Sequence, residues 1–564
     1  MSGDLPIGII LVAGGLLTPL VPKTLRGAFL LALPVLTFAQ IFSLSPGQSV
    51  SVEAFGATLE IVRVDRLSLA FGYIFAIAAF INVIFAWHVR ESFEQAVALV
   101  YAGSALGAIF AGDMVTLFVF WELSALASVF LIWAGGTERA RRAGLRYITV
   151  QLLSGMLLLA GAAIRYAESG SLKFEWIGLD GAGGALIFAA IGIKCAFPLL
   201  HNWLQDAYPE ATPTGTVVLS AFTTKLGIYA LARGFPGTEE LVYVGALMTA
   251  FPIFYAVIEN DLRRVLSYSL NNQLGFMVVG IGLGTDMGLN GAVAHAFADI
   301  LFKALLFMSM GAVLFRTGTV KGTDLGGLYK SMPLTTGFCM VGAASISAFP
   351  LFSGFVTKSM IMASAAEEGY TFIWLVLLFA SAGVFHHAGI KIPYFAFFSH
   401  DSGIRCKEAP ANMLIAMGVA AVLCIGIGTF PGALYAILPG PVTYVPYSAA
   451  HVISQLQLLV FSALAFSFLM RTGIYPPEMR SVNLDSDWFY RRLARGIART
   501  AEHAINYTRS MATALVVRCF RSAAIPFIDL HRPNAFLART WSTSGMALGV
   551  MVILLAYLLG YYVL

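Results

Sequence analysis

Apolar runs of about 20 residues recur along this chain, and each is long enough to cross a hydrocarbon layer about 30 Å thick as a helix. Hydrophobic residues make up 58% of the 564 positions and charged residues 12%, whereas about a quarter of a typical soluble domain is charged. The mean hydropathy is +0.80. A membrane barrel would show short strands of alternating polarity instead. The sequence therefore predicts an all-α polytopic membrane protein with about 14–16 transmembrane helices.

The positions of basic residues predict how these helices are oriented. We expect spans at about 5–22, 26–43, 66–88, 94–112, 114–134, 146–166, 184–201, 213–233, 239–258, 264–284, 288–316, 333–365 (broken), 371–395, 411–437, 449–470 and 543–563. Lysine and arginine follow odd-numbered spans, for example at Lys23, Arg90, Arg142, Arg264 and Lys407. Because cytoplasmic loops are enriched in these residues, we expect a multi-pass protein of the inner (plasma) membrane with its N-terminus outside the cytoplasm.

Two of the apolar segments are interrupted by proline close to a lysine. The motif AFPLL at 196–200 follows Lys194, and its echo AFPLF at 348–352 precedes Lys358. Pro198 cannot donate a hydrogen bond to the carbonyl of Lys194, so we expect the helix to break there. Polar residues follow the first break, namely His201, Asn202, Gln205 and Asp206. Broken helices in two halves of a chain indicate a transport site built from repeats.

Ionisable side chains also lie inside several apolar helices, where a charge costs roughly 2.5–3.5 kcal/mol. The candidate site residues are Glu122, Lys194, Lys225, His295, Asp299, Lys303 and Lys358. Among them, His295, Asp299 and Lys303 are spaced four apart and share one helix face. Asp113 begins a predicted helix and is interpreted as a possible cap. The alternative to a functional role is a set of structural ion pairs.

A row of titratable groups at membrane depth is what a proton relay requires. Burial favours the neutral form of a lysine, and a nearby carboxylate favours its charged form. Movement of Glu122 toward or away from Lys194 would therefore change the proton affinity of the lysine. This is the mechanism that we expect.

Other chemistries find little support in the sequence. The five cysteines are scattered without a CxxC pair, and the histidines lack ligand spacing such as HExxH. The adjacent His386 and His387 are interpreted as packing or loop residues. No Walker A or dinucleotide fingerprint is present. We therefore predict no cofactor and no metal.

The C-terminal part is different in character. Residues 476–540 are polar and basic, and Arg492, Arg495 and Arg499 share one helix face. This pattern favours an amphipathic helix at the membrane surface or along a partner, which we expect Pro526 and Pro533 to break. A solvated basic loop is the alternative. A last apolar span at 541–564 is typical of an anchor.

Five motifs together resemble one known family. They are IGIKCAFPLLHNWLQDAYPEATP (191–213), TTKLGIYAL (223–231), DLRRVLSYSLNNQLG (261–275), HAFADILFKALLF (295–307) and FPLFSGFVTKSM (349–360). The family is that of the proton-translocating antiporter-like subunits, which includes the large pumping subunits of NADH:quinone oxidoreductase and the A and D subunits of Mrp-type antiporters. The segments TTKLGIYAL and KIPYFAFF (391–398) look most like the Mrp-type D subunits.

The resemblance implies a fold and a site. It implies two inverted five-helix repeats with broken helices, so that the chain would divide into 1–110, 111–235 (first repeat), 236–400 (second repeat), 401–475, 476–540 and 541–564. It implies a gating pair of Glu122 and Lys194, a central axis through Lys225, His295 and Lys303, and a terminal Lys358. Some relatives place a second histidine where Asp299 stands. The tail is longer than in a plain Mrp-type D subunit.

The leading functional prediction is a subunit of a Mrp-type complex that exchanges Na⁺, or another monovalent cation, for protons. It is a secondary transporter subunit, and its expected partners are other membrane subunits, lipid, protons and the cation, with no nucleic acid. One alternative is a pumping subunit of a redox-driven complex, whose electron chemistry would lie in partner chains. Further alternatives are a membrane subunit that energises inorganic carbon uptake and a scaffold without transport.

Overall fold

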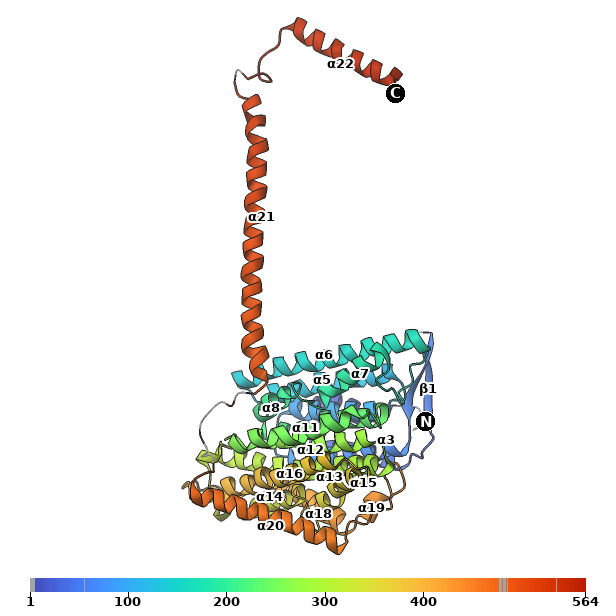
Figure 1. Ribbon diagram of the computed structural model, residues 1–564, viewed down its shortest axis with the longest axis vertical. Helices are drawn as coiled ribbons and strands as arrows, with labels where there is room; N and C mark the ends of the chain where they lie inside the picture. Colours follow the sequence, from blue (N-terminus) through green and yellow to red (C-terminus); the bar gives the residue numbers. More distant parts are fainter. Residues whose placement is uncertain are drawn as a thin grey trace. The chain divides into compact units, whose positions relative to one another are not determined.

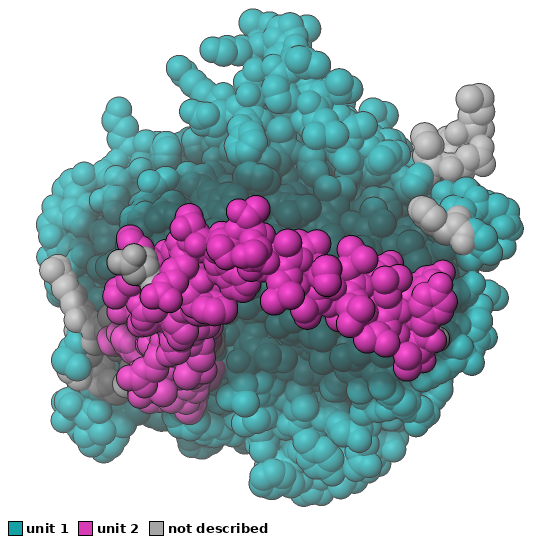
Figure 2. Space-filling model, turned by 90° about the horizontal axis from the view of Figure 1, so that it is seen from above, with its two compact units in different colours: residues 1–483 teal, residues 484–564 magenta. Residues whose placement is uncertain are grey.

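The computed structural model describes residues 6–54, 56–475, 479, 483, 485–533 and 535–563. The first residue of the predicted span at 5–22 and parts of the predicted tail segment (476–478, 480–482, 484 and 534) lie outside the described residues. The chain forms two compact units, Met1–Asn483 and Leu484–Leu564, which are coloured separately in Figure 2.

The first unit is a bundle of helices (Figure 1). Its N-terminal helices are α1 (Ile9–Leu17), α2 (Lys23–Phe42), α3 (Arg66–Phe85) and α4 (Ser92–Ile109). The next are α5 (Met114–Trp133), α6 (Glu138–Ser169), α7 (Gly181–Lys194), α8 (Asn202–Ala207), α9 (Pro213–Ala221), α10 (Thr223–Gly234) and α11 (Glu240–Ile258). They are followed by α12 (Leu262–Leu283), α13 (Asp286–Thr317), α14 (Pro333–Ile346), α15 (Ser353–Glu367), α16 (Thr371–Val384) and α17 (Lys391–Pro393). The last are α18 (Ala411–Thr429), α19 (Gly432–Tyr435) and α20 (Ala449–Thr472).

Each predicted span contains a helix, which confirms the all-α polytopic fold. Thirteen helices in the described part of the chain are long and apolar enough to cross a membrane. All of them except Arg491–Leu530 overlap a predicted span. Helix α12 has 22 residues but is not one of these thirteen described helices, because the polar run SYSLNNQ lowers its hydropathy.

Side-chain caps determine where many of the helices begin. Asp113 accepts hydrogen bonds from the backbone N–H groups of Val115 and Thr116, so the predicted cap is confirmed. Asp261 caps α12 in the same way, through Arg263 and Arg264. Glycines in the left-handed conformation, such as Gly170, Gly284 and Gly318, follow the ends of α6, α12 and α13. Aspartate at the N-terminus and glycine after the C-terminus are the residues that helix ends prefer.

Helix α13 lies at the centre of the first unit. It packs against α3, α9, α12, α14, α15 and α18, and most of its residues are buried. The outward surfaces carry exposed apolar side chains, among them Met156, Val422, Phe461 and Phe130. A soluble protein rarely exposes so much apolar surface, whereas a lipid-facing surface requires it.

A feature that the sequence did not predict is a β-hairpin between α2 and α3. Strands β1 (Ser49–Ala54) and β2 (Ala57–Arg63) pair antiparallel. The hairpin lies at one end of the bundle, close to the N-terminus (Figure 1). Its last residue, Arg63, is two residues before the N-cap of α3.

The second unit consists of α21 (Ala494–Leu530) and α22 (Thr543–Val563). A π-helical turn, Phe489–Leu493, precedes α21 and contains Arg492. The expectation that Pro526 breaks this segment is wrong, because α21 continues through it to Leu530. Proline removes one backbone hydrogen bond from a helix, and the carbonyl that loses its donor here belongs to Ser522, an exposed residue. Solvent or a partner can therefore satisfy it.

Candidate functional site

The two proline interruptions have the same backbone geometry. Four described non-glycine residues have positive φ values, namely Ala196 (57°), Leu199 (70°), Ala348 (56°) and Leu351 (73°). Each costs roughly 1–2 kcal/mol in this left-handed region, and such strain is concentrated at functional sites. In both breaks an amide closes onto a carbonyl five residues back, from Phe197 to Gly192 and from Phe349 to Ala344. The short echo in the sequence therefore marks two equivalent breaks.

A second pair of matched features flanks the breaks. Asp113 and Asp261 each cap a helix, and each forms an isolated β-bridge with a later lysine, Lys173 or Lys321. The spacing from aspartate to lysine is the same in both cases. Two copies of one structural unit would produce these matches, although the boundaries at 111–235 and 236–400 remain a prediction.

Polar side chains donate hydrogen bonds to backbone carbonyl groups at both breaks. Pro350 cannot donate to the carbonyl of Ile346, and the ammonium Nζ of Lys358 donates to it at 3.0 Å. In the first break, Nδ2 of Asn271 donates to the carbonyl of Ala196 at 2.6 Å. The second broken helix therefore holds its own lysine in place.

Lys194 is the last residue of α7 and is completely buried. Its Nζ donates to the carbonyl of Trp121 and to the hydroxyl of Ser124, each at 3.1 Å, and lies 4.4 Å from the centroid of the Trp121 ring. Glu122 lies between these two residues on α5, yet its Oε1 is buried and has no hydrogen-bond partner among the residues that the structure describes. Lys194 thus contacts the turn of α5 that carries Glu122, and there is no direct bond between these two described side chains.

The carboxylate of Glu122 occupies the space beside Gly155 on α6. A Cβ atom added at Gly155 would overlap Oε1 and the carboxyl carbon of Glu122. The carboxylate of Glu122 can therefore lie here only because residue 155 has no side chain. The sequence analysis missed this residue, although a glycine inside a helix costs about 1 kcal/mol relative to alanine and calls for a packing reason.

Lys225 on α10 and Asp299 on α13 form a buried ion pair. Their Nζ and Oδ2 atoms lie 2.6 Å apart, and neither side chain has exposed surface. Lys225 also donates to the carbonyl of Ser220 at 3.2 Å. Removal of one partner from such a pair typically costs about 3–5 kcal/mol. Asp299 therefore joins two helices and does not pair with its neighbours on α13.

The two other predicted residues of α13 both contact α12, and His295 also contacts α15. His295 lies 3.0 Å from Oγ1 of Thr357 through Nδ1 and 3.0 Å from Oε1 of Gln273 through Nε2. Lys303 donates to the carbonyl of Leu266 at 3.5 Å. Both side chains are completely buried. The polar face of α13 thus contacts α10, α12 and α15, which together carry Lys225, Gln273 and Lys358.

The polar residues after the first break lie inside the protein, as expected. His201, Asn202 and Gln205 are buried. Asp206 accepts two hydrogen bonds from Arg146, at 2.6 and 3.0 Å. Both amide atoms of Gln205 are buried without a hydrogen-bond partner among the described residues. Buried polar groups of this kind are usually satisfied by water.

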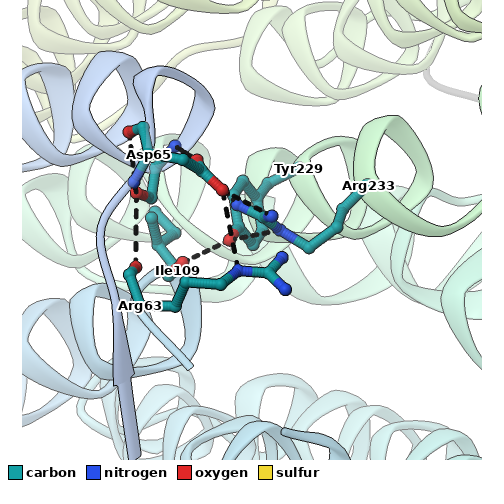
Figure 3. Close-up of polar contacts among 6 residues, drawn as sticks. Arg63, Asp65, Ile109, Tyr229 and Arg233 are labelled. Carbon is teal, nitrogen blue, oxygen red and sulfur yellow. Dashed lines mark hydrogen bonds and ion pairs between the residues drawn. The ribbon is translucent and has the colours of Figure 1, made fainter. Parts of the chain in front are cut away.

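A cluster at the end of α10 fixes the helix that carries Lys225 (Figure 3). Arg233 donates to both carboxylate oxygens of Asp65, at 2.7 and 2.9 Å, and to the hydroxyl of Tyr229 at 2.8 Å. Tyr229 in turn donates to the carbonyl of Ile109. The pair of Arg63 and Asp65 is longer, at 3.6 Å. The cluster ties α10 to the start of α3 and the end of α4.

Several polar residues of the first unit were missed by the sequence analysis. Lys391 is buried and donates to the last carbonyls of α11, at 2.6 Å for Val257 and 2.7 Å for Glu259. A positive charge is stabilising at the C-terminal end of a helix, where the carbonyl groups are unpaired. His386 and His387 lie on the π-helical turn Phe385–Ile390 and not in a loop; of the two predicted alternatives, packing is the one confirmed, because His387 is buried and the His386 ring contacts Phe466. The polar run NNQ inside an apolar helix was the sequence pattern that could have indicated a buried role for Gln273.

The fold and the site define a polytopic membrane protein with ionisable groups buried along its interior. A model of the NADH:quinone oxidoreductase/Mrp antiporter transmembrane family matches residues 111–385. The N subunit of the NADH-quinone oxidoreductase of Desulforudis audaxviator is 31% identical over 376 residues, which cover 60% of this chain and 74% of that protein. The chain belongs to this family.

Two further similarities show how far the likeness extends. The D subunit of the Na(+)/H(+) antiporter of Alkalihalophilus pseudofirmus is 30% identical over 308 residues, 50% of this chain and 62% of that protein. The chain thus spans less than two thirds of that relative. A chain of the membrane-bound sulfane sulfur reductase, an archaeal respiratory membrane complex, has a TM-score of 0.71 at 23% identity and covers 98% of this chain and 100% of its own. That likeness concerns the fold.

Proposed function

We propose that this chain is a proton- and cation-translocating membrane subunit of a Mrp-type antiporter complex. The observation that carries the proposal is the set of buried ionisable groups, because Lys194, Lys225, Lys303, Asp299 and Lys358 have almost no exposed surface. Membrane proteins place charges at this depth chiefly for transport. The similarity to the D subunit of a Na(+)/H(+) antiporter supports Na⁺ as the cation.

In this proposal, protons move along three groups of residues. Glu122 and Lys194 gate one end, since Lys194 now bonds to neutral partners and Glu122 is free to approach it. The pair of Lys225 and Asp299 forms the middle. Beyond it, His295 and Lys303 lead to Lys358. Loss of a proton from one group lowers the charge that its neighbour experiences, which is how a relay advances.

The chain acts together with other membrane subunits in the plasma membrane, with its N-terminus outside the cytoplasm. Its apolar outer surfaces and the long helix α21 offer contacts for such partners. Substitution of Arg492 and Arg495 by alanine should weaken assembly more than turnover. Unchanged stability of the detergent-solubilised complex would contradict a docking role for this segment.

The test is exchange in membrane vesicles that contain the full complex. Lys194→Ala and Glu122→Ala should each abolish Na⁺-driven proton exchange while the complex still assembles. Lys407→Ala, which changes an exposed lysine in a loop, is the matched control and should leave exchange intact. Normal exchange in both test variants at normal expression would overturn the relay.

A redox-driven proton pump is the second candidate. It is favoured by the structural likeness to a respiratory complex, which extends over nearly the whole chain, including the tail. Proteins that co-purify with the chain decide between the two. Small membrane subunits without redox centres would support the antiporter, and iron–sulfur subunits would support the pump.

A further inference from the structure

A chain of amide hydrogen bonds determines which nitrogen of His295 always carries a proton. Nδ2 of Asn272 donates to the backbone carbonyl of Thr249, and because a carbonyl only accepts, this bond fixes the orientation of the Asn272 amide. Oδ1 of Asn272 then accepts from Nε2 of Gln273 at 2.7 Å. Gln273 must therefore present its Oε1 to Nε2 of His295, at 3.0 Å. Since that oxygen also only accepts, Nε2 of His295 holds an N–H group.

The other ring nitrogen faces a group that can both donate and accept. Nδ1 of His295 lies 3.0 Å from Oγ1 of Thr357, and the same hydroxyl lies 3.0 Å from the backbone carbonyl of Ser353. A hydroxyl has a single hydrogen to donate. When His295 is neutral, that hydrogen points to Nδ1. When His295 is charged, Nδ1 donates to Oγ1 and the hydroxyl donates to Ser353.

We propose that His295 exchanges its mobile proton only through Nδ1, and that the hydroxyl of Thr357 passes this proton to and from α15. The inference rests on the proposed function. On release, the Nδ1–H bond breaks as a new H–Oγ1 bond forms, and the former hydroxyl proton leaves to a water molecule on the α15 side. Gln273 acts as a positioning residue, because it keeps the second nitrogen occupied.

Lysines on three helices and one paired aspartate are the charged groups that act on His295. Lys225 on α10, Lys303 on α13 and Lys358 on α15 all act electrostatically against a charged ring. Asp299, one turn along α13, is already paired with Lys225. Thr357 precedes Lys358 directly in the sequence, so the hydroxyl that contacts Nδ1 and the next lysine of the relay lie on the same helix.

The experiment compares exchange in vesicles that contain the full complex with substitutions at two buried threonines. Thr357→Val keeps the shape of the side chain and removes the hydroxyl. It should lower exchange about a hundredfold or more, the contribution typical of a positioned proton-transfer group. Thr357→Ser should restore exchange. Thr224→Val is the matched control, because the hydroxyl of Thr224 is buried and no described residue forms a hydrogen bond with it. Wild-type exchange in Thr357→Val would overturn the inference.

A second measurement does not depend on how well Thr357→Val assembles. Gln273→Glu keeps an acceptor for Nε2 and adds a negative charge beside the ring, which favours the charged imidazole. The pH of half-maximal exchange should rise by about one unit, and an unchanged pH profile would overturn the inference. Loss of exchange in Lys194→Ala together with normal exchange in Thr357→Val would retain the proposed function and reject only this inference.

Discussion

Gly155→Ala is a sharp test of the gate, because it changes no charged residue. The new Cβ atom would occupy the place of the Glu122 carboxylate, which would have to rotate away from α6. The carboxylate is the far end of a flexible side chain, so the helices themselves need not move. The substitution should therefore displace the acid while the fold is preserved.

The expected energies indicate that Gly155→Ala changes the rate of exchange and leaves the stability nearly unchanged. Alanine favours a helix over glycine by about 1 kcal/mol, and an unfavourable rotamer of Glu122 costs about 0.5–1.5 kcal/mol. These two terms nearly cancel, so the stability of the complex should change little. A reacting group that is misplaced by about 1 Å can lower a rate by a factor of about one hundred. We therefore expect exchange to fall between about tenfold and one hundredfold.

The assay is Na⁺-driven proton exchange in vesicles, with the amount of assembled complex measured in the same membranes. Gly426→Ala on α18 is the matched control, because a Cβ atom there meets open space. Exchange at the wild-type rate in Gly155→Ala, with wild-type assembly, would refute the placement of Glu122 in the gate.

Three further predictions concern other parts of the first unit. Lys358→Ala should abolish exchange in the same vesicles, and retained exchange would remove Lys358 from the relay. Asp65→Asn weakens the charged hydrogen bonds from Arg233, so it should lower the stability of the complex by about 2–3 kcal/mol in a thermal unfolding assay; Asp180→Asn, an exposed residue without a capping bond, should have no effect. Arg405, together with the Gly403 N–H and Lys330, lowers the pKa of Asp401 below its usual value. Because the pKa of the folded state is the lower one, this stabilisation is present above about pH 4 and is lost as the pH falls further. The protection of amides in the loop at 399–410, measured as hydrogen exchange relative to the intrinsic rate at each pH, should accordingly fall on acidification in the wild type and change less in Asp401→Asn.

Helix positions could be predicted because the membrane imposes their length. An apolar run of about 20 residues has few alternatives to a spanning helix, and caps such as Asp113 determine where it begins. Proline near lysine also predicted both breaks, which share positive φ values at equivalent alanines and leucines. By contrast, Pro526 did not break α21, because an exposed helix can tolerate one unpaired carbonyl.

The partners of the buried charges could not be predicted, because they depend on how distant helices pack. The spacing along α13 placed Asp299 on one helix face with His295 and Lys303, whereas in the structure Asp299 forms its ion pair with Lys225 on α10. The family resemblance implied a pair of Glu122 and Lys194, but it could not predict that Lys194 bonds to Trp121 and Ser124 and that the carboxylate of Glu122 lies beside Gly155. No pattern of periodicity contains such contacts between helices.

The most direct test of the account replaces the buried pair by apolar residues of similar size. A buried ion pair can often be exchanged for hydrophobic side chains without loss of stability, so the double substitution Lys225→Met and Asp299→Leu should assemble normally. Proton movement is then measured with the purified complex in liposomes. The account predicts a stable complex that moves no protons, and proton movement at the wild-type rate would contradict it.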